Sequence, residues 1–258
     1  MKQPLDSFRL DGRVAVVTGA SSGMGVTFAE ALAAAGARVV VAARRLDKLR
    51  EVVAGIERDG GVAHAVACDV SREDEVERLV AETAQRYGPA DVLVNNAGFT
   101  TVVAAEEQSA ADWRAHLDVN LTGVFLCAQR FGRGMLAAGR GSIVNVASVL
   151  GFVASGQIRQ AAYAASKGGV VNLTRELAAQ WARRGVRVNA LAPGWFPTEM
   201  TADMFGDDRS LAWMRSRTPL GRGGELSELA GPLLFLASDA SSFVTGHILT
   251  VDGGWTIV

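Results

Sequence analysis

The sequence has few residues of the kinds that stabilise a fold through disulfides or metals. It contains two cysteines and three histidines in 258 residues. Cys68 and Cys127 do not make a disulfide framework, so a reducing compartment, the cytoplasm, is the expected location. His64, His116 and His247 lie far apart and have no partners at metal-ligand spacing, so no catalytic metal is expected.

Long apolar runs and an excess of one charge are also missing. No run approaches the ~18 residues needed to span a bilayer, and residues 1–6 lack the apolar stretch of a signal peptide. The formal net charge of -1 gives no basic surplus for nucleic acid or an anionic membrane. We therefore expect a protein that binds neither nucleic acid nor a membrane.

Short runs rich in β-branched residues alternate with longer stretches of helical pattern. The runs predict strands at 14–18, 38–42, 62–67, 92–95, 142–147, 186–192 and 247–251. Several lack polar alternation, which is typical of strands buried on both faces. Helices are expected between them, including one opened by Ser71 and two long ones at 111–138 and 164–181. This order predicts a single α/β domain over 1–258, a doubly wound Rossmann fold whose seven-stranded parallel sheet has helices on both faces.

A glycine-rich loop follows the first expected strand. Gly19, Gly23 and Gly25 have the spacing G-x-x-x-G-x-G and precede a helix. Glycines let the backbone turn sharply and let a pyrophosphate approach the free N–H groups of the helix N-terminus. Turns also need glycine for their own sake, but the place of this loop between strand and helix predicts a nucleotide site.

The end of the second expected strand indicates which nucleotide is bound. A site that prefers NAD(H) usually has Asp or Glu here to accept from the ribose 2′-hydroxyl, but position 43 is Ala43. Arg44 and Arg45 follow, and a guanidinium matches a phosphate bidentately. NADP(H) is therefore the preferred cofactor. NAD(H) stays open as the alternative, as does a pair of solvated arginines at a helix start.

Tyr163 and Lys167 lie four positions apart on an expected helix and therefore share a face. A free tyrosine has a pKa of about 10, and a nearby ammonium favours the phenolate. The pair can thus supply a general acid for reduction and a base for oxidation. The alternative is an ordinary amphipathic helix that exposes both side chains.

Taken together and in order, these motifs resemble the short-chain dehydrogenase/reductase family, in its single-domain branch of about 250 residues. The resemblance covers essentially the whole chain. It is carried by the loop at 18–25, by Asn95-Asn96-Ala97-Gly98, Asn120, Ser148, Tyr163-Ala164-Ala165-Ser166-Lys167, Pro193-Gly194 with Thr198, and Val251-Asp252-Gly253-Gly254.

The resemblance implies a set of cofactor-binding residues. They would contact the pyrophosphate, adenine, ribose and nicotinamide in turn, and they are Gly19, Ser21, Ser22, Gly23, Met24, Gly25, Arg44, Arg45, Asp69, Val70, Asn96, Ala97, Gly98, Tyr163, Lys167, Pro193, Gly194 and Thr198.

The resemblance also implies four catalytic residues. Tyr163 would exchange a proton with the substrate oxygen, with Lys167 beside it. Ser148 would donate a hydrogen bond to the carbonyl oxygen, as an oxyanion-hole donor does. Asn120 would hold a water that relays protons to Lys167. The cofactor would carry the hydride.

The interval from Ser148 to Tyr163 is slightly longer than is usual in the family. The extra residues fall at 156–159, within one of three expected substrate loops at about 99–107, 149–159 and 195–213. Gln157, Arg159 and Trp195 are the expected substrate neighbours. Apolar residues in these loops suit a hydrophobic ketone, although they would equally pack a lid against the body.

The resulting hypothesis is an NADP(H)-dependent carbonyl reductase or alcohol dehydrogenase that acts on a small molecule. The alternatives are an NAD-dependent sugar or polyol dehydrogenase, a nucleotide-sensing protein without catalysis, and a sugar-nucleotide epimerase, for which the chain is short. The helices at 111–138 and 164–181 have more apolar surface than one sheet face needs. We therefore expect a homotetramer or a dimer.

Overall fold

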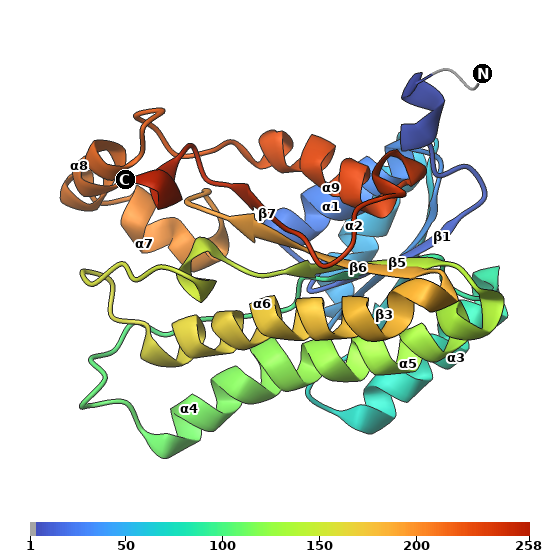
Figure 1. Cartoon of the computed structure of the whole chain (residues 1–258), viewed down its shortest axis with the longest axis horizontal. Helices are drawn as coiled ribbons and strands as arrows, with labels where there is room; N and C mark the ends of the chain where they lie inside the picture. The colour runs from blue at the N-terminus through green and yellow to red at the C-terminus, as the bar shows by residue number, and fades with distance from the viewer. Residues whose placement is uncertain (1–3) are drawn as a thin grey trace.

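The structure is a computed structural model that describes residues 4–258, and its seven strands form one parallel sheet (Figure 1). The strand order is β3-β2-β1-β4-β5-β6-β7, and each neighbouring pair is parallel. The strands are β1 (Val14–Thr18), β2 (Arg38–Ala43), β3 (Val62–Ala67), β4 (Val92–Asn95), β5 (Gly141–Val146), β6 (Val186–Pro193) and β7 (Ile248–Val251). The expected seven-stranded parallel sheet is confirmed.

Helices cover both faces of this sheet (Figure 1). One face carries α1 (Met24–Ala34), α2 (Leu46–Arg58) and α9 (Ala230–Ala237), and the other carries α3 (Glu73–Tyr87), α5 (Gly123–Ala138) and α6 (Ala161–Trp181). Three more helices are α4 (Ala110–Leu117), α7 (Ala202–Phe205) and α8 (Asp208–Arg217). No helix within residues 4–258 is long and apolar enough to cross a membrane.

Short helical segments connect these elements. The 3-10 segments are η1 (Pro4–Phe8), η3 (Val149–Gly151), η4 (Ala182–Arg184), η5 (Glu199–Thr201), η6 (Leu226–Leu229), η7 (Asp239–Ser241) and η8 (Trp255–Ile257). The start of α6 and the short helices α7 and α8 lie at the same end of the molecule (Figure 1). The loops that follow the strands are therefore gathered there.

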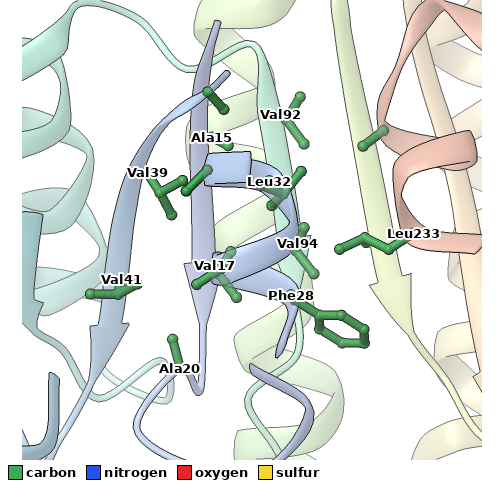
Figure 2. Close-up of a cluster of buried hydrophobic side chains, with 14 of the residues drawn as sticks. Ala15, Val17, Ala20, Phe28, Leu32, Val39, Val41, Val92, Val94 and Leu233 are labelled. Carbon is green, nitrogen blue, oxygen red and sulfur yellow. The ribbon is translucent and has the colours of Figure 1, made fainter. Parts of the chain in front are cut away.

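The strands are apolar at consecutive positions because each face of the sheet is buried. In β1, Ala15 and Val17 pack against α1 and α9, whereas Val16 packs in the cluster on the opposite face. Figure 2 shows Phe28 of α1 and Leu233 of α9 lying against the first face. Burying a large apolar side chain contributes about 1.5–3 kcal/mol, so this two-sided core holds the strand ends, and the loops after them, in fixed positions.

The strand order reverses between β1 and β4, because the chain winds from β1 to β3 in one direction and from β4 to β7 in the other. A crevice forms at such a switch point, beyond the carboxyl ends of the two strands. The glycine-rich loop follows β1, and Asn96-Ala97-Gly98 follows β4. Both motifs therefore face the same crevice.

Three helix expectations differ from the structure. The helix expected at 111–138 is divided into α4, a π-helical turn η2 (Asp118–Thr122) and α5. The helix expected from 164 begins at Ala161, because Ala161 and Ala162 are strong helix formers. Ser71 does not cap α3; its hydroxyl donates to Asp69 Oδ1 at 2.7 Å.

Candidate active site

A cavity of about 630 Å³ opens at the carboxyl ends of the strands. It brings together most of the site residues expected from the sequence. The lining includes Gly19, Ser21, Ser22, Gly23, Met24, Arg44, Arg45, Asp69, Val70, Asn96, Ala97, Gly98, Ser148, Tyr163, Lys167, Pro193, Gly194, Trp195 and Thr198. Gly25, Asn120, Gln157 and Arg159 do not line it.

The glycine-rich loop is shaped for an anion at the start of α1. Gly23 is the N-cap of α1, with φ 56°, and no side chain caps the helix there. Gly23 and Met24 both line the cavity, so the N–H groups of the first turn are available to a ligand. Gly25 serves packing instead, because a Cβ there would collide with the carbonyl oxygen of Gly19. The loop therefore fits the pyrophosphate of a dinucleotide.

Two arginines follow β2 and border the cavity. Arg44 is exposed and forms no ion pair with residues 4–258. Arg45 donates to Ser21 Oγ at 3.1 Å, to Ser22 Oγ at 2.8 Å and to Glu199 Oε2 at 3.1 Å. The residues at the end of β2 thus supply two guanidinium groups and no acid, since position 43 is alanine.

Three polar side chains converge at the other end of the cavity. Ser148 follows β5, and Tyr163 and Lys167 lie on one face of α6. Lys167 is buried; its Nζ donates to Val146 O at 2.7 Å and lies 5.6 Å from the centre of the Tyr163 ring. Ser148 Oγ accepts from Leu150 N at 3.2 Å and also hydrogen-bonds Tyr163.

Burial controls the protonation of the tyrosine and the lysine. It raises the pKa of Tyr163, and the hydrogen bond from Ser148 opposes that shift. Burial lowers the pKa of Lys167 to about 8. The sequence indicated that the ammonium would favour a phenolate, but in this chain desolvation of the phenolate outweighs that effect. Tyr163 therefore holds its proton at neutral pH, as a proton donor must.

Asn120 lies in the π-helical turn η2 and is fully buried. Its Nδ2 donates to Phe99 O at 2.9 Å and to Ser166 Oγ at 3.2 Å, and its Oδ1 accepts from Phe99 N at 3.0 Å. The amide thus fixes the loop after β4 to α6. π-helical turns are frequent at functional sites, and here the turn places Asn120 between the two elements.

The loop after β5 faces the cavity with residues that the sequence did not single out. Ile158 and Gln160 line the cavity, whereas the expected neighbours Gln157 and Arg159 are exposed outside it. A backbone bridge joins this segment to the loop after β4, between Val103 and Gln160. Gln160 lies one helical turn before Tyr163, and that spacing is the signal that could have found it.

Trp195 is held in a cluster of three indoles. Its ring centre lies 5.9 Å from that of Trp213 and 5.7 Å from that of Trp255, both edge to face. Edge-to-face contacts of this kind are favourable beyond the area they bury. The cluster ties α8 and the C-terminal residues to the loop after β6, so the cavity wall at Trp195 is rigid.

Metal ligands are not gathered anywhere in the part of the chain that the structure describes. Residues 4–258 contain no group of three or more His, Cys, Asp or Glu side chains that could hold a metal ion.

Comparison with known proteins gives matches over the whole chain. A family model described as Enoyl-(Acyl carrier protein) reductase matches residues 19–256. Gluconate 5-dehydrogenase of Gluconobacter oxydans (strain 621H) is 44% identical over 252 residues, which cover 98% of each chain. Galactitol 2-dehydrogenase (L-tagatose-forming) of Cereibacter sphaeroides is 45% identical over 250 residues, covering 97% of each.

A solved structure agrees closely with this fold. It is the gluconate 5-dehydrogenase from Burkholderia cenocepacia J2315 in complex with NADP and tartrate, with a TM-score of 0.95 and 42% identity. The match covers 99% of this chain and 100% of that one. The sheet, the glycine loop, the Ser148–Tyr163–Lys167 arrangement and these matches together show that the chain is an oxidoreductase of the short-chain dehydrogenase/reductase family.

Proposed function

We propose that this protein is an NADP(H)-dependent oxidoreductase that interconverts a ketone and a secondary alcohol. The observation that carries the proposal is a single cavity with proton-transfer residues at one end and phosphate-binding residues at the other. Ser148, Tyr163 and Lys167 converge at one end, and Arg44 and Arg45 border the other. Hydride transfer needs a carbonyl and a nicotinamide close together, and a single continuous cavity can hold both.

Two features support NADP(H) over NAD(H). The end of β2 offers guanidinium groups and no carboxylate of its own, which suits a 2′-phosphate. Arg44 forms no ion pair within the described residues, although its charge interacts with that of Asp69, so it can bind an added phosphate without breaking a salt bridge. A similar protein has been solved with NADP. Gly19, Gly23 and Met24 would lie along the pyrophosphate.

The proposed chemistry of the chain is proton transfer and orientation. NADPH, when bound, supplies the hydride that reduces the carbonyl carbon. Ser148 donates a hydrogen bond that orients the carbonyl oxygen, and Tyr163 gives that oxygen its proton as the C–O⁻ charge develops. Lys167 stabilises the tyrosinate that remains. In the oxidative direction Tyr163 takes the hydroxyl proton.

Oxidation of a sugar or polyol is the second candidate function. It is favoured by the names of two relatives at 44% and 45% identity, a gluconate dehydrogenase and a galactitol dehydrogenase. The same Ser148 and Tyr163 would act on such a substrate, in the reverse direction. The two candidates share one mechanism and differ in which compound fills the cavity.

We also propose that the chain self-associates, as a homotetramer or a dimer. Trp113 on α4 and Phe125 on α5 are each 39% exposed, and Phe243 is exposed completely. Apolar side chains of this size are costly to leave in water. Sedimentation of the purified protein tests the assembly.

Cys68 and Cys127 are free and buried, and the cytoplasmic location stays a prediction.

The proposed function is tested by following NADPH and NADH oxidation with a panel of ketones, diketones, β-keto esters and ketoses, and NADP⁺ reduction with polyols. We expect consumption of NADPH well above that of NADH. Consumption that favours NADH would contradict the role given to the arginines. NADPH binding without turnover of any compound would support a nucleotide-sensing protein instead.

A further inference from the structure

Apart from Lys167, no basic side chain of residues 4–258 lines the part of the cavity that surrounds Ser148 and Tyr163. Its walls come from the loops after β4, β5 and β6. Many of the side chains are apolar, among them Leu150, Ile158, Trp195 and Met204. The charged residues that these loops contribute to the lining are Glu199 and Asp203, which are both acidic.

Among the described residues, three basic side chains line the cavity, and each lies far from Ser148 or already has a partner. Arg45 is engaged by Glu199 in an ion pair of 3.1 Å, and both Arg44 and Arg45 follow β2, which is separated from β5 by β1 and β4. At about 4.8 Å for each strand spacing, the ends of β2 and β5 lie about 14 Å apart. Lys167 Nζ is tied to Val146 O at 2.7 Å, below Tyr163. A substrate carboxylate next to Ser148 would therefore find no cation beside it, in the part of the chain described, that lacks a partner.

One polar group on this wall is free to bind a neutral oxygen. Thr100 Oγ1 lies 3.3 Å from Gln160 Oε1 and 3.4 Å from Thr101 O, within hydrogen-bond distance of both. The Gln160 Nε2 group has no hydrogen-bond partner among residues 4–258. Gln160 lines the cavity and is half-buried, so its amide N–H groups are available to a compound in that space.

We infer that, if the proposed function holds, the substrate is an uncharged carbonyl compound or alcohol. A second oxygen of this substrate accepts a hydrogen bond from Gln160, and its remaining groups lie against the apolar wall. Moving a carboxylate out of water without a partner costs several kcal/mol, so sugar acids and keto acids are excluded. A hydroxyl or ester oxygen is desolvated more cheaply and gains the Gln160 bond.

The exclusion of carboxylates is tested with pairs in which a neutral group replaces the carboxylate, such as 4-oxopentanoate and its methyl ester, at saturating NADPH. We expect kcat/KM for the ester to exceed that for the acid by at least tenfold, equivalent to about 1.4 kcal/mol. Equal use of both, or preference for the acid, would overturn the inference. Absence of NADPH oxidation with every carbonyl compound would overturn the proposed function as well. Failure of the inference alone and failure of the proposed function therefore give different results.

A designed cation gives a second measurement. Val102 lines the cavity and is 67% exposed, so the fold tolerates a longer side chain there. Val102→Arg should raise the kcat/KM of the acid relative to the ester by about tenfold, the effect of one charge-assisted hydrogen bond. Val102→Gln is the control of similar size, and it should leave the ratio unchanged. An unchanged ratio in Val102→Arg would contradict a substrate position near this wall.

The role of Gln160 is tested with 1-hydroxy-2-butanone and 2-butanone, which lacks the hydroxyl. Gln160→Leu should lower the preference for the hydroxyketone by about fivefold to tenfold, as expected for one lost hydrogen bond. Gln157→Leu is the matched control, because Gln157 lies nearby but outside the cavity, and it should change neither substrate. An equal fall for both substrates in Gln160→Leu would mean that Gln160 acts only through the helix that carries Tyr163, and it would overturn the assignment.

Discussion

Arg45 and Glu199 form an ion pair of 3.1 Å that joins the segment after β2 to the loop after β6. Ser22 completes the link, because its hydroxyl donates to the same Glu199 oxygen at 2.9 Å. Both pair members border the cavity. The Glu199 carboxylate therefore occupies the guanidinium and the hydroxyl that an incoming phosphate would also seek.

The ion pair predicts that Glu199 weakens the binding of NADPH. Both side chains are about half exposed or more, so their pairing is worth about 1 kcal/mol at most. Glu199→Gln should tighten NADPH binding by up to about fivefold and leave NADH within about twofold. Fluorescence titration measures both constants. Asp203→Asn, which also borders the cavity but forms no pair with the described residues, is the control. Weaker NADPH binding in Glu199→Gln would instead mean that Glu199 holds Arg45 ready for the phosphate.

Arg44 is expected to discriminate between the two nicotinamide cofactors. A hydrogen bond to a charged group contributes about 1.5–3 kcal/mol, so Arg44→Ala should weaken NADPH binding by about tenfold to a hundredfold. NADH lacks the 2′-phosphate and should be nearly unaffected. Arg50→Ala is the matched control, because Arg50 is exposed on α2 and does not line the cavity. Equal losses for both cofactors would remove Arg44 from the recognition of the phosphate.

The sheet and the cofactor loop could be predicted from sequence because their signals are local. Each buried strand is a short apolar run such as that of β1, and the observed ends differ from the expected ones by no more than a residue or so. Gly19, Gly23 and Gly25 are diagnostic because they stand between a strand and a helix. In these segments the local sequence pattern is enough to locate the element.

The π-helical turn and the substrate wall could not be predicted, because contacts between distant residues determine them. The turn that contains Asn120 is stabilised by the amide bonds to Phe99 and Ser166. Gln160 forms a backbone bridge with Val103. Apart from the spacing of Gln160 one helical turn before Tyr163, neither contact leaves a pattern in the local sequence. The sequence predicted substrate contacts at Gln157 and Arg159, whereas Ile158 and Gln160 are the residues of that segment that line the cavity.

Replacement of Tyr163 by phenylalanine should lower turnover while leaving NADPH binding nearly unchanged. A positioned proton donor contributes about 10²–10⁴-fold to a rate, so Tyr163→Phe should lower kcat by that factor. NADPH binding should stay within about twofold, since the ring and its packing are kept. Tyr87 is the other tyrosine of the chain, and it lies on α3, outside the cavity. Tyr87→Phe should therefore turn over normally. Retained activity in Tyr163→Phe would exclude it as the proton donor.

The pH dependence of NADPH binding should report the ionisation of Lys167. Burial lowers the pKa of this lysine to about 8, below its ordinary value. Below pH 8 the ammonium is present and attracts the anionic cofactor. Above pH 8 binding must restore the proton, so the affinity should fall by up to about tenfold for each pH unit. Titrations between pH 7 and 10 measure this slope. Lys167→Met should show no such slope, and a wild-type affinity that is flat across pH 8 would contradict the assignment.

A substitution of Asn120 should show whether this residue takes part in a proton relay or positions the loop after β4. Its amide is buried and makes three hydrogen bonds, two of them with the backbone of Phe99. Asn120→Ala leaves both Phe99 groups without partners, and each buried unsatisfied group costs about 1–3 kcal/mol. The variant should therefore unfold more easily, by about 2–4 kcal/mol in urea titrations, and its KM should rise because the loop after β4 forms part of the substrate wall. A residue that acted only through a relayed water would behave differently. The variant would then keep its stability and KM, and kcat alone would fall.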